Sequence, residues 1–446
     1  MSCISSNISS KRAWSLILIF LGLLTLADNI LSNALPIILG PVPPQTPGFW
    51  NLTTMALILS TASELVGQLV LGFFAFYYSS KHAMYFNSSS ILISSICSLL
   101  SLLLLAKGAV WTSALAPVFK VIGGGSHSTA FLTLVLLREQ TSGSLRAALI
   151  YATGAVIVLC QMIASSVTPL LANSNPILPY ILSILCCLLA YVATLLHDND
   201  GSPRLEKADH SSTRPLLKNV SEAKSAFSPT LREFRADYSQ IWRSMSFQAI
   251  SPVRLLGLVF VLASIAKATR PLFITYIQHR VGITPQFANY LWLVRFIMSL
   301  FIFAVLLPRA VILLSRRKPT QLRSLTLAIS KGGVVLLATG AFFIGLAQSK
   351  PLLILGLIVN TLGVATDLSL LAFAADSITE DIASRFFMFI ASLESAGTLI
   401  GIGFLYPLYQ LCLDDHTIVG GVPYYACAAL FAVAGCIVWS MEPVAD

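Results

Sequence analysis

The stretch WSLILIFLGLLTLADNILSNALPIIL, residues 14–39, decides the fold class because it is apolar over the length of a membrane-spanning helix. It is too long for the apolar part of a cleaved signal peptide, so we expect it to remain as a membrane anchor. One carboxylate, Asp28, interrupts it. A charged side chain at the bilayer centre costs at least ~2.5 kcal/mol unless it is paired or faces water. We therefore expect Asp28 to lie in a polar site with a positively charged partner.

The composition of the whole chain supports the same class. Of 446 residues, 56% are hydrophobic and only 11% are charged, and the mean hydropathy is +0.82. In an ordinary soluble domain, roughly a quarter of the residues are charged, so this composition indicates a membrane protein with many spans. Most of the eight cysteines lie in or beside apolar segments, which favours small core residues over a disulfide framework. The sequence has no CxxC or histidine-rich tract, so we expect no metal and no cofactor.

Twelve apolar runs long enough to cross ~30 Å of hydrocarbon recur along the chain, in two blocks of six. The predicted spans are 14–39, 53–77, 84–106, 111–137, 147–171, 176–196, 254–277, 287–307, 324–347, 351–375, 384–411 and 422–440. They predict an all-α membrane protein with an N-terminal bundle over 14–196 and a C-terminal bundle over 253–440. A cytosolic N-terminus (1–13), a polar cytosolic linker (197–252) and a short cytosolic tail (441–446) complete the predicted domains.

The positions of lysine and arginine predict the orientation in the membrane. With the N-terminus inside, the outer loops hold only Lys107, Arg280 and Lys350, and most of the other basic residues fall on the inner side. Both termini are therefore expected to be cytosolic. The net charge of +9 then reflects anchoring at the inner leaflet and not nucleic acid. We expect a multi-pass protein of the plasma membrane, with the vacuolar membrane as the alternative, and a glycan at the sequon of Asn51.

The linker ends in a segment with a pattern of its own. In TLREFRADYSQIWRSMSF, residues 230–247, apolar side chains share one helical face and charged side chains lie opposite. This pattern predicts a helix on the inner surface of the membrane, with a solvated linker helix as the alternative.

Charged residues also lie within the predicted spans, away from their ends. They are Asp28, Glu64, Lys120, Lys267, Arg270, Arg295, Lys331, Asp367 and Glu394. At ~1.5 Å per residue, Asp28 lies about 16 Å and Lys120 about 14 Å from the outer ends of their spans, so the two are level. Lys331 lies close enough to the inner end of its span to extend its amine to the surface.

The remaining charges leave more than one interpretation open. Lys267 and Arg270 are three residues apart on one helical face and favour an anionic, carboxylate-bearing solute. Arg295 and Glu394 form a looser candidate pair, for which contact between helices is the favoured role. Glu64 has no evident partner, and it is either a proton carrier or a hydrogen-bonded packing residue.

Histidine and aromatic residues in the spans have two possible roles each. His127 lies beside a glycine patch, so helix packing is favoured over proton relay or substrate binding. Several rings could form an apolar wall for an organic solute, although packing is the commoner role of such residues. These rings are Phe273, Tyr276, Tyr290, Trp292 and Phe296.

The six-plus-six pattern with a long linker resembles the major facilitator superfamily. Lys120 followed by Gly123–Gly125 is similar to the basic residue and glycine patch of the family's fourth helix. Glu139 and Arg146 are similar to the acidic residue and arginine that follow that helix. Between the second and third helices, GFFAFYYSSK (72–81) keeps the first glycine and the last lysine of the family pattern but lacks its aspartate. The antiporter motif of the family's fifth helix is not recognisable.

The resemblance implies two pseudo-symmetric six-helix bundles around a central cavity, lined by helices one, four, seven and ten. Asp28 and Lys120 would then face each other across this cavity. Lys267, Arg270 and Asp367 would line it from the second bundle.

Together these features predict a secondary active transporter that moves a small organic solute by alternating access with proton coupling. Efflux of a metabolite is the first expectation, by analogy with filamentous-fungal members. Proton-driven nutrient uptake is the alternative, and a non-transporting sensor is another because residues 72–81 depart from the family pattern. An enzyme is not expected, since the six histidines are scattered along the chain. The expected partners are protons, the solute and the lipid bilayer, and the expected state is a monomer.

Overall fold

The computed structural model describes residues 2–39, 52–77, 80–105, 116–141, 143–199, 251–270, 272–317, 321–377, 380–412 and 418–441. These residues form helices joined by short turns, and this described part of the chain contains no strand. The linker helix expected at 230–247 and the sequon at Asn51 lie outside the described residues, so both stay predictions.

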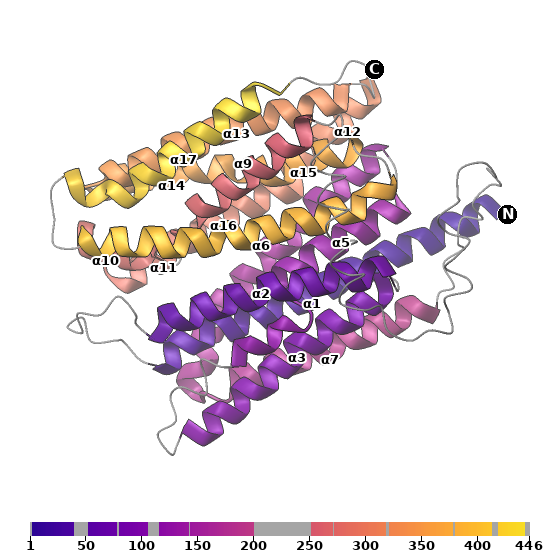
Figure 1. Ribbon diagram of the computed structural model, residues 1–446, viewed down its shortest axis with the longest axis horizontal. Helices are drawn as coiled ribbons and strands as arrows, with labels where there is room; N and C mark the ends of the chain where they lie inside the picture. The colour runs from indigo at the N-terminus through magenta and orange to yellow at the C-terminus, as the bar shows by residue number, and fades with distance from the viewer. Residues whose placement is uncertain are drawn as a thin grey trace, which may run out of the picture.

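The helices of the first half form one group (Figure 1). They are α1 (Ser2–Leu39), α2 (Leu52–Tyr77), α3 (Ser80–Leu105), the 3₁₀ helix η1 (Ala116–Val121), α5 (Ser126–Gln140), α6 (Gly143–Ser174) and α7 (Leu178–Asn199).

The helices of the second half form the other group. They are α9 (Ser251–Lys267), α10 (Phe273–Val281), α11 (Pro285–Phe301), the π-helix η3 (Ile302–Leu306), α12 (Leu307–Arg317), α13 (Gln321–Leu346), α14 (Lys350–Leu362), η4 (Gly363–Ala365), α15 (Thr366–Ser377), α16 (Glu380–Leu411), η5 (Ile418–Gly421) and α17 (Val422–Trp439).

Ten segments within the described residues are helices long and apolar enough to cross a membrane. The fourth and seventh predicted spans are interrupted instead, which corrects the expectation of continuous helices there. The fourth is divided into η1 and α5 by a turn in which Gly124 has a left-handed φ of 71°. The seventh is divided into α9 and α10 after Lys267, where the sequence carries Pro271. A residue that precedes proline is disfavoured in helical backbone, so the helix ends before it.

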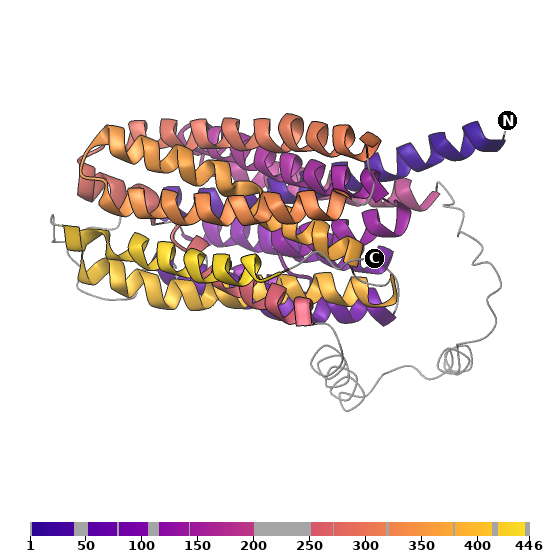
Figure 2. The ribbon, with the colours of Figure 1, turned by 90° about the horizontal axis from the view of Figure 1, so that it is seen from above.

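The two groups of helices lie side by side with their axes in similar directions (Figure 1). The first half, coloured indigo to magenta, includes α1, α2, α3 and α7, and the second half includes α9, α13, α14 and α17. Helix α2 packs against α16, and α6 packs against α11 and α12, so these contacts join the halves. The start of α1 and the end of α17 lie at the same end of the molecule (Figures 1 and 2).

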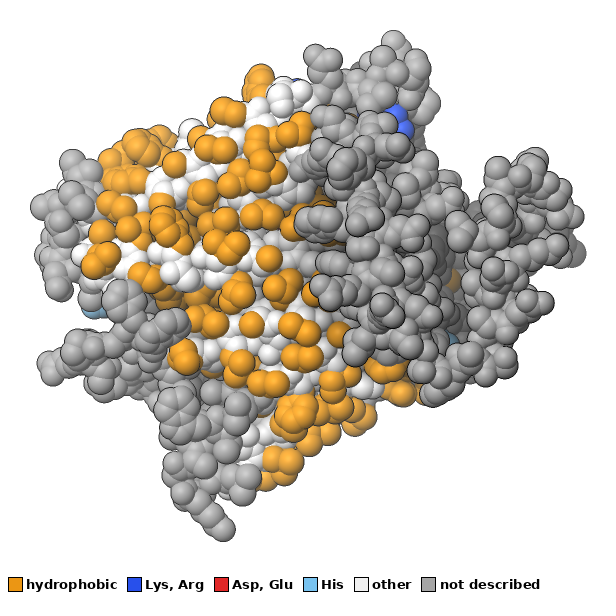
Figure 3. Space-filling view, in the orientation of Figure 1, with side chains coloured by type: hydrophobic (Ala, Val, Ile, Leu, Met, Phe, Trp, Pro, Cys, Tyr) orange, Lys and Arg blue, Asp and Glu red, His pale blue; other side chains and the backbone are white. Residues whose placement is uncertain are grey.

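The outer surface of the helices is apolar. On the face shown in Figure 3, the described side chains are mostly hydrophobic. Large exposed apolar side chains such as Leu170, Phe301 and Leu313 occur in both halves. A soluble protein rarely exposes a continuous apolar surface of this extent, so contact with lipid explains it.

An apolar core closes the space between the halves at one end. It joins Phe131 and Ile150 of the first half to Phe260 and Phe386 of the second, and it includes Met441 just beyond α17. The closed end is therefore the end at which α1 begins and α17 finishes. Hydrogen bonds also join the halves, from Gln68 to Ser395 (2.8 Å), between Tyr151 and Ser369 (3.0 Å), and from Arg146 to the Ala375 carbonyl (3.4 Å).

Candidate functional site

A cavity of about 1060 Å³ lies between the halves and is lined by both of them. At mid-depth it reaches Asp367 and Glu394. Its lining continues to Asn33 near the end of α1, Thr275 in α10 and Gln410 near the end of α16. Thr275 and Gln410 are exposed, so the cavity opens at the end opposite the apolar core. The expected central cavity is thus present, closed on the side of the termini and open on the other.

The break in the fourth span positions Lys120, which lies in the last turn of η1. A Cβ atom on Gly67 of α2 would lie 2.1 Å from the carbonyl oxygen of Lys120. A Cβ atom on Gly125 would lie 2.5 Å from Glu64 Oε1. Larger residues at these two positions would clash, so the glycines allow α2 to approach the broken helix closely. This close approach brings Glu64 within reach of Lys120.

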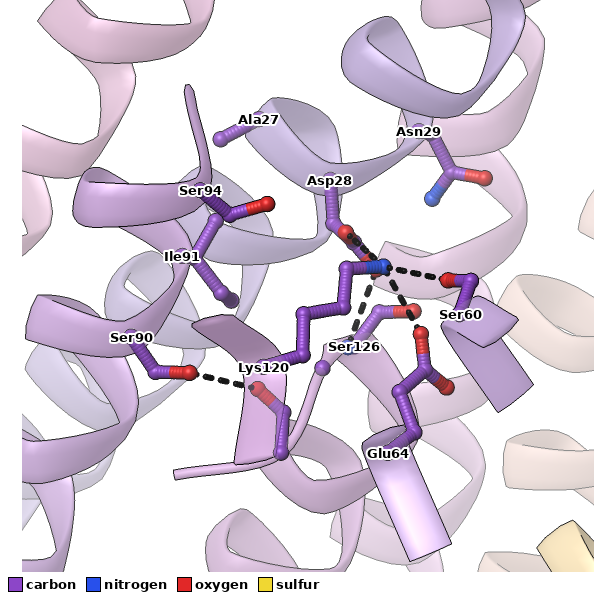
Figure 4. A network of polar contacts seen from close by, with 12 residues as sticks. Ala27, Asp28, Asn29, Ser60, Glu64, Ser90, Ile91, Ser94, Lys120 and Ser126 are labelled. Atoms are coloured by element: carbon purple, nitrogen blue, oxygen red, sulfur yellow. Dashed lines mark hydrogen bonds and ion pairs between the residues drawn. The ribbon is translucent and has the colours of Figure 1, made fainter. Parts of the chain in front are cut away.

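Lys120 is the centre of a buried charge network, which we call the Lys120 network and define as Asp28, Glu64 and Lys120 (Figure 4). The Lys120 Nζ lies 2.7 Å from Asp28 Oδ1, 2.7 Å from Glu64 Oε1 and 3.3 Å from Ser60 Oγ. Only 2% of Lys120, 3% of Asp28 and 8% of Glu64 is exposed. The backbone N–H of Ser126, the first residue of α5, donates to Asp28 Oδ2 at 3.0 Å. The positive end of that helix therefore also stabilises the Asp28 carboxylate.

Two expectations are settled by this geometry. The ion pair of Asp28 with Lys120 is confirmed. The expectation that Glu64 lacks a partner was wrong, because Glu64 is the second carboxylate on Lys120. The depth of Glu64 was a signal for this pairing, since Glu64 lies about 17 Å from the outer end of its predicted span at ~1.5 Å per residue, level with Asp28 and Lys120. Depth could not show which way the Glu64 side chain faces, and that direction depends on the break at the glycine patch.

A second ion pair joins two helix ends on the far side of the cavity. Lys267 lies in the last turn of α9, and Asp367 lies in the first turn of α15. A cation at a helix C-terminus and an anion at a helix N-terminus are both favoured by the helix dipole. The Lys267 Nζ and the Asp367 Oδ2 form an ion pair. The charge of Lys267 is thus compensated within the protein, and Lys267 does not act with Arg270 as a free pair of cations.

Arg270 and Arg295 line the cavity differently. Arg270 is exposed to it, and the Arg295 guanidinium lies 4.8 Å from the centre of the Trp292 ring. Within the part of the chain that the structure describes, neither guanidinium has a carboxylate within 4 Å. The predicted pair of Arg295 with Glu394 is therefore not formed. Glu394 lines the cavity and interacts over longer range with Lys267, Asp367, Arg270 and His127.

The aromatic residues singled out in the sequence divide into three groups. Trp292 and Phe296 line the cavity and stack on each other with ring centres 5.7 Å apart. Phe273 and Tyr276 pack inside an apolar core, and Tyr290 is exposed. The cavity wall also contains rings that the sequence pattern did not single out, namely Phe303, Tyr406 and Tyr409. These rings lie in uninterrupted apolar runs, so nothing in the pattern separated them from lipid-facing residues.

Other polar residues of the spans have structural roles or lie at the cavity edge. His127 lines the cavity, although it lies beside the glycine patch. The Lys331 Nζ donates to the carbonyl oxygen of Trp439, at the end of α17, so the amine reaches the end of the helix bundle. Asn87 is buried, and its side chain donates to the Gly123 carbonyl at 2.7 Å. The side chains of Glu139 and of residues 73–81 lie outside the described part of the structure.

Comparison with known proteins returns transporters. No protein-family model matches the chain. The MFS-type transporter avaK of Aspergillus versicolor is 21% identical over 324 residues, which are 72% of this chain and 68% of avaK.

Solved structures show the same fold over almost the whole chain. The proton:xylose symporter XylE of the major facilitator superfamily superimposes with a TM-score of 0.69 at 14% identity, covering 98% of this chain and 96% of XylE. The human organic anion transporter MFSD10 superimposes with a TM-score of 0.62 at 15% identity, covering 96% of this chain and 99% of MFSD10.

Proposed function

Because the chain has the fold of the major facilitator superfamily, we propose that it is a secondary active transporter that moves a small organic solute by alternating access. The observation that carries the proposal is the cavity between the halves, open at one end and closed at the other by an apolar core. Opening the core and closing the other end would expose the same charged residues to the opposite side. The cavity is built from one chain, so we propose a monomer.

The proposed coupling ion is the proton, carried by the Lys120 network. Its two carboxylates share one ammonium group, which leaves an excess negative charge when both are ionised. An uncompensated charge in a buried site is costly, and one bound proton removes it. Glu64 is the proposed carrier, because it is more exposed than Asp28 and its Oε2 makes no hydrogen bond in the described part of the structure. Asp28 is held at both oxygens, by Lys120 and by the Ser126 N–H.

We propose export of a metabolite as the direction of transport, on the analogy with a fungal MFS-type transporter. Uptake with protons is the second candidate, and the likeness to a proton:xylose symporter favours it. With both termini in the cytosol, the observed cavity opens outward, and an outward-open state belongs to either cycle. The proposed location is the plasma membrane.

The test begins by comparing the metabolites inside and outside cells with and without the protein, which identifies candidate solutes. Each candidate is then placed in proteoliposomes that contain the full chain and a pH-sensitive dye. We expect solute flux and proton movement together in the wild type, and solute flux without proton coupling in Glu64→Gln. A wild-type protein that moves none of the solutes that differ between the cells would favour a sensor over a transporter. The sign of the pH change relative to solute movement separates export from uptake.

A further inference from the structure

Two of the four described cations around the cavity have no carboxylate partner. Lys120 has two carboxylates and Lys267 has one. Arg270 and Arg295 have none within 4 Å among the described residues, although both line the cavity. A positive charge inside a membrane protein is costly without a counter-charge, so this pair requires an explanation.

Arg270 and Arg295 lie in the same part of the cavity wall. Both line the large cavity, and both also line a second cavity of about 40 Å³ next to it. Like charges in one small region repel each other, and Arg270 is among the charges that act on Arg295. The nearest acidic groups relieve this repulsion only in part, because Asp367 is bound to Lys267 and Glu394 acts on Arg270 from more than 4 Å away. A negatively charged ligand between the arginines would relieve it.

The helix break and an aromatic ring hold the two arginines in place. The Arg270 N–H donates to the Lys267 carbonyl at 3.0 Å in the turn that follows α9, and its side chain is exposed to the cavity. Arg295 lies three residues after Trp292 on α11 and packs over its ring. A guanidinium fixed on an aromatic face keeps its planar fork free for two parallel hydrogen bonds to a carboxylate.

The rest of the cavity suits a body that is apolar and contains a ring. Trp292, Phe296, Tyr406 and Tyr409 line its wall, and Arg295 packs over the Trp292 ring. The volume of about 1060 Å³ is at the upper end of the range for small-molecule sites, so it accommodates a molecule of several fused or linked rings.

From these observations we infer that Arg270 and Arg295 form the anion subsite of the transport cavity, and that the solute is an organic monoanion with a carboxylate on an apolar, ring-containing body. The inference rests on the proposed transport function, because it names the solute class of the same cavity. One negative charge is the favoured number, because Asp367 and Glu394 already act on Arg270 at longer range. The sequence pattern predicted Lys267 with Arg270 for this role, and the ion pair of Lys267 with Asp367 transfers it to Arg295.

The test is equilibrium binding to the purified full chain in detergent. The probes are 2-naphthoate and indole-3-acetate, each compared with its neutral amide and with an amine of the same body. We expect at least one carboxylate to bind at least tenfold more tightly than its amide and its amine, because a charged hydrogen bond contributes ~1.5–3 kcal/mol and 1.4 kcal/mol is tenfold. Arg270→Gln and Arg295→Gln should each weaken this binding about tenfold or more, while Arg295→Lys should restore part of it.

Arg309→Gln is the matched control, since Arg309 is exposed on α12 and does not line the cavity. Gel filtration of each variant in the presence of the carboxylate checks that it is folded. Equal binding of acid and amide, no binding of any carboxylate, or unchanged binding in both arginine variants would overturn the inference. Proteoliposomes separate it from the proposed function. Anion binding without any solute or proton flux would reject the proposed transporter and keep the anion subsite. Coupled flux of a neutral or cationic solute that is unchanged in Arg270→Gln and Arg295→Gln would keep the transporter and reject the anion subsite.

Discussion

Replacing Lys120 by methionine should destabilise the protein, because it removes the one described cation within 4 Å of the Asp28 and Glu64 carboxylates. Methionine is similar in length and fills the same space, so the loss of charge is the main change. Removing one partner of a buried ion pair costs ~3–5 kcal/mol. Two carboxylates lose their partner here, but protonation of one of them and water from the cavity offset part of the cost. We therefore expect a total loss of ~3–5 kcal/mol for Lys120→Met.

Glu64→Gln should have the opposite effect on the same network. It removes the excess negative charge, and the amide oxygen can still accept the hydrogen bond from Lys120 that Glu64 Oε1 accepts. Its stability should equal or exceed that of the wild type. The double variant Lys120→Met with Glu64→Gln should recover part of the loss, because the remaining carboxylate of Asp28 keeps the Ser126 N–H.

The assay is thermal unfolding of the full chain in one detergent, followed by tryptophan fluorescence. With an unfolding entropy of ~2.1 cal/mol/K per residue, the expected loss corresponds to a fall in Tm of about 3–5 °C. Lys331→Met is the control, because the Lys331 Nζ contacts a carbonyl oxygen and not a carboxylate. An unchanged Tm in Lys120→Met, or an equal fall in Glu64→Gln, would refute the conclusion that one ammonium group neutralises two carboxylates.

Three further predictions concern packing, gating and topology. Gly67→Ala should cost ~1–3 kcal/mol because its Cβ would lie 2.1 Å from a carbonyl oxygen, whereas Gly332→Ala, with nothing within 4 Å, should not lower the Tm. Equal melting of the two alanine variants would contradict the close approach of α2. Tyr151→Phe removes a hydrogen bond to Ser369 between the halves, worth ~0.5–1.5 kcal/mol, so hydrogen exchange in α6 and α15 should become about 2–10-fold faster. Unchanged exchange would show that this bond does not hold the closed end. Mass sensitive to endoglycosidase should disappear only in Asn51→Gln, and a glycan on Asn219, in the predicted cytosolic linker, would overturn the predicted orientation.

The depth of each charge along its helix was predictable from the sequence. Helix rise is constant, so counting residues from the end of a span placed Asp28 and Lys120 at one level, and the structure joins them. The same reasoning placed Lys331 near one end of its span, and its Nζ contacts the Trp439 carbonyl at the end of α17. The apolar runs also predicted where helices lie, because a backbone in lipid must satisfy its hydrogen bonds internally.

The partners of the other charges depended on the tertiary structure. A residue count gives depth but not the direction in which a side chain points around the helix axis, and it gives no warning of a break. The breaks after Lys120 and Lys267 turn each helix, so that Glu64 reaches Lys120 and Asp367 reaches Lys267. Arg270 then extends from the second break into the cavity, where it joins Arg295.

The sequence by itself thus determined that the chain is a bundle of membrane helices with charges at mid-depth. This follows because the length and polarity of each segment are properties of the local chain alone. The tertiary structure decided which of these charges neutralise each other, which remain available to a solute, and which end of the cavity is open. Those outcomes depend on how α2, α9 and α15 rotate and pack against their neighbours, and close packing of one helix is set by the side chains of all the others.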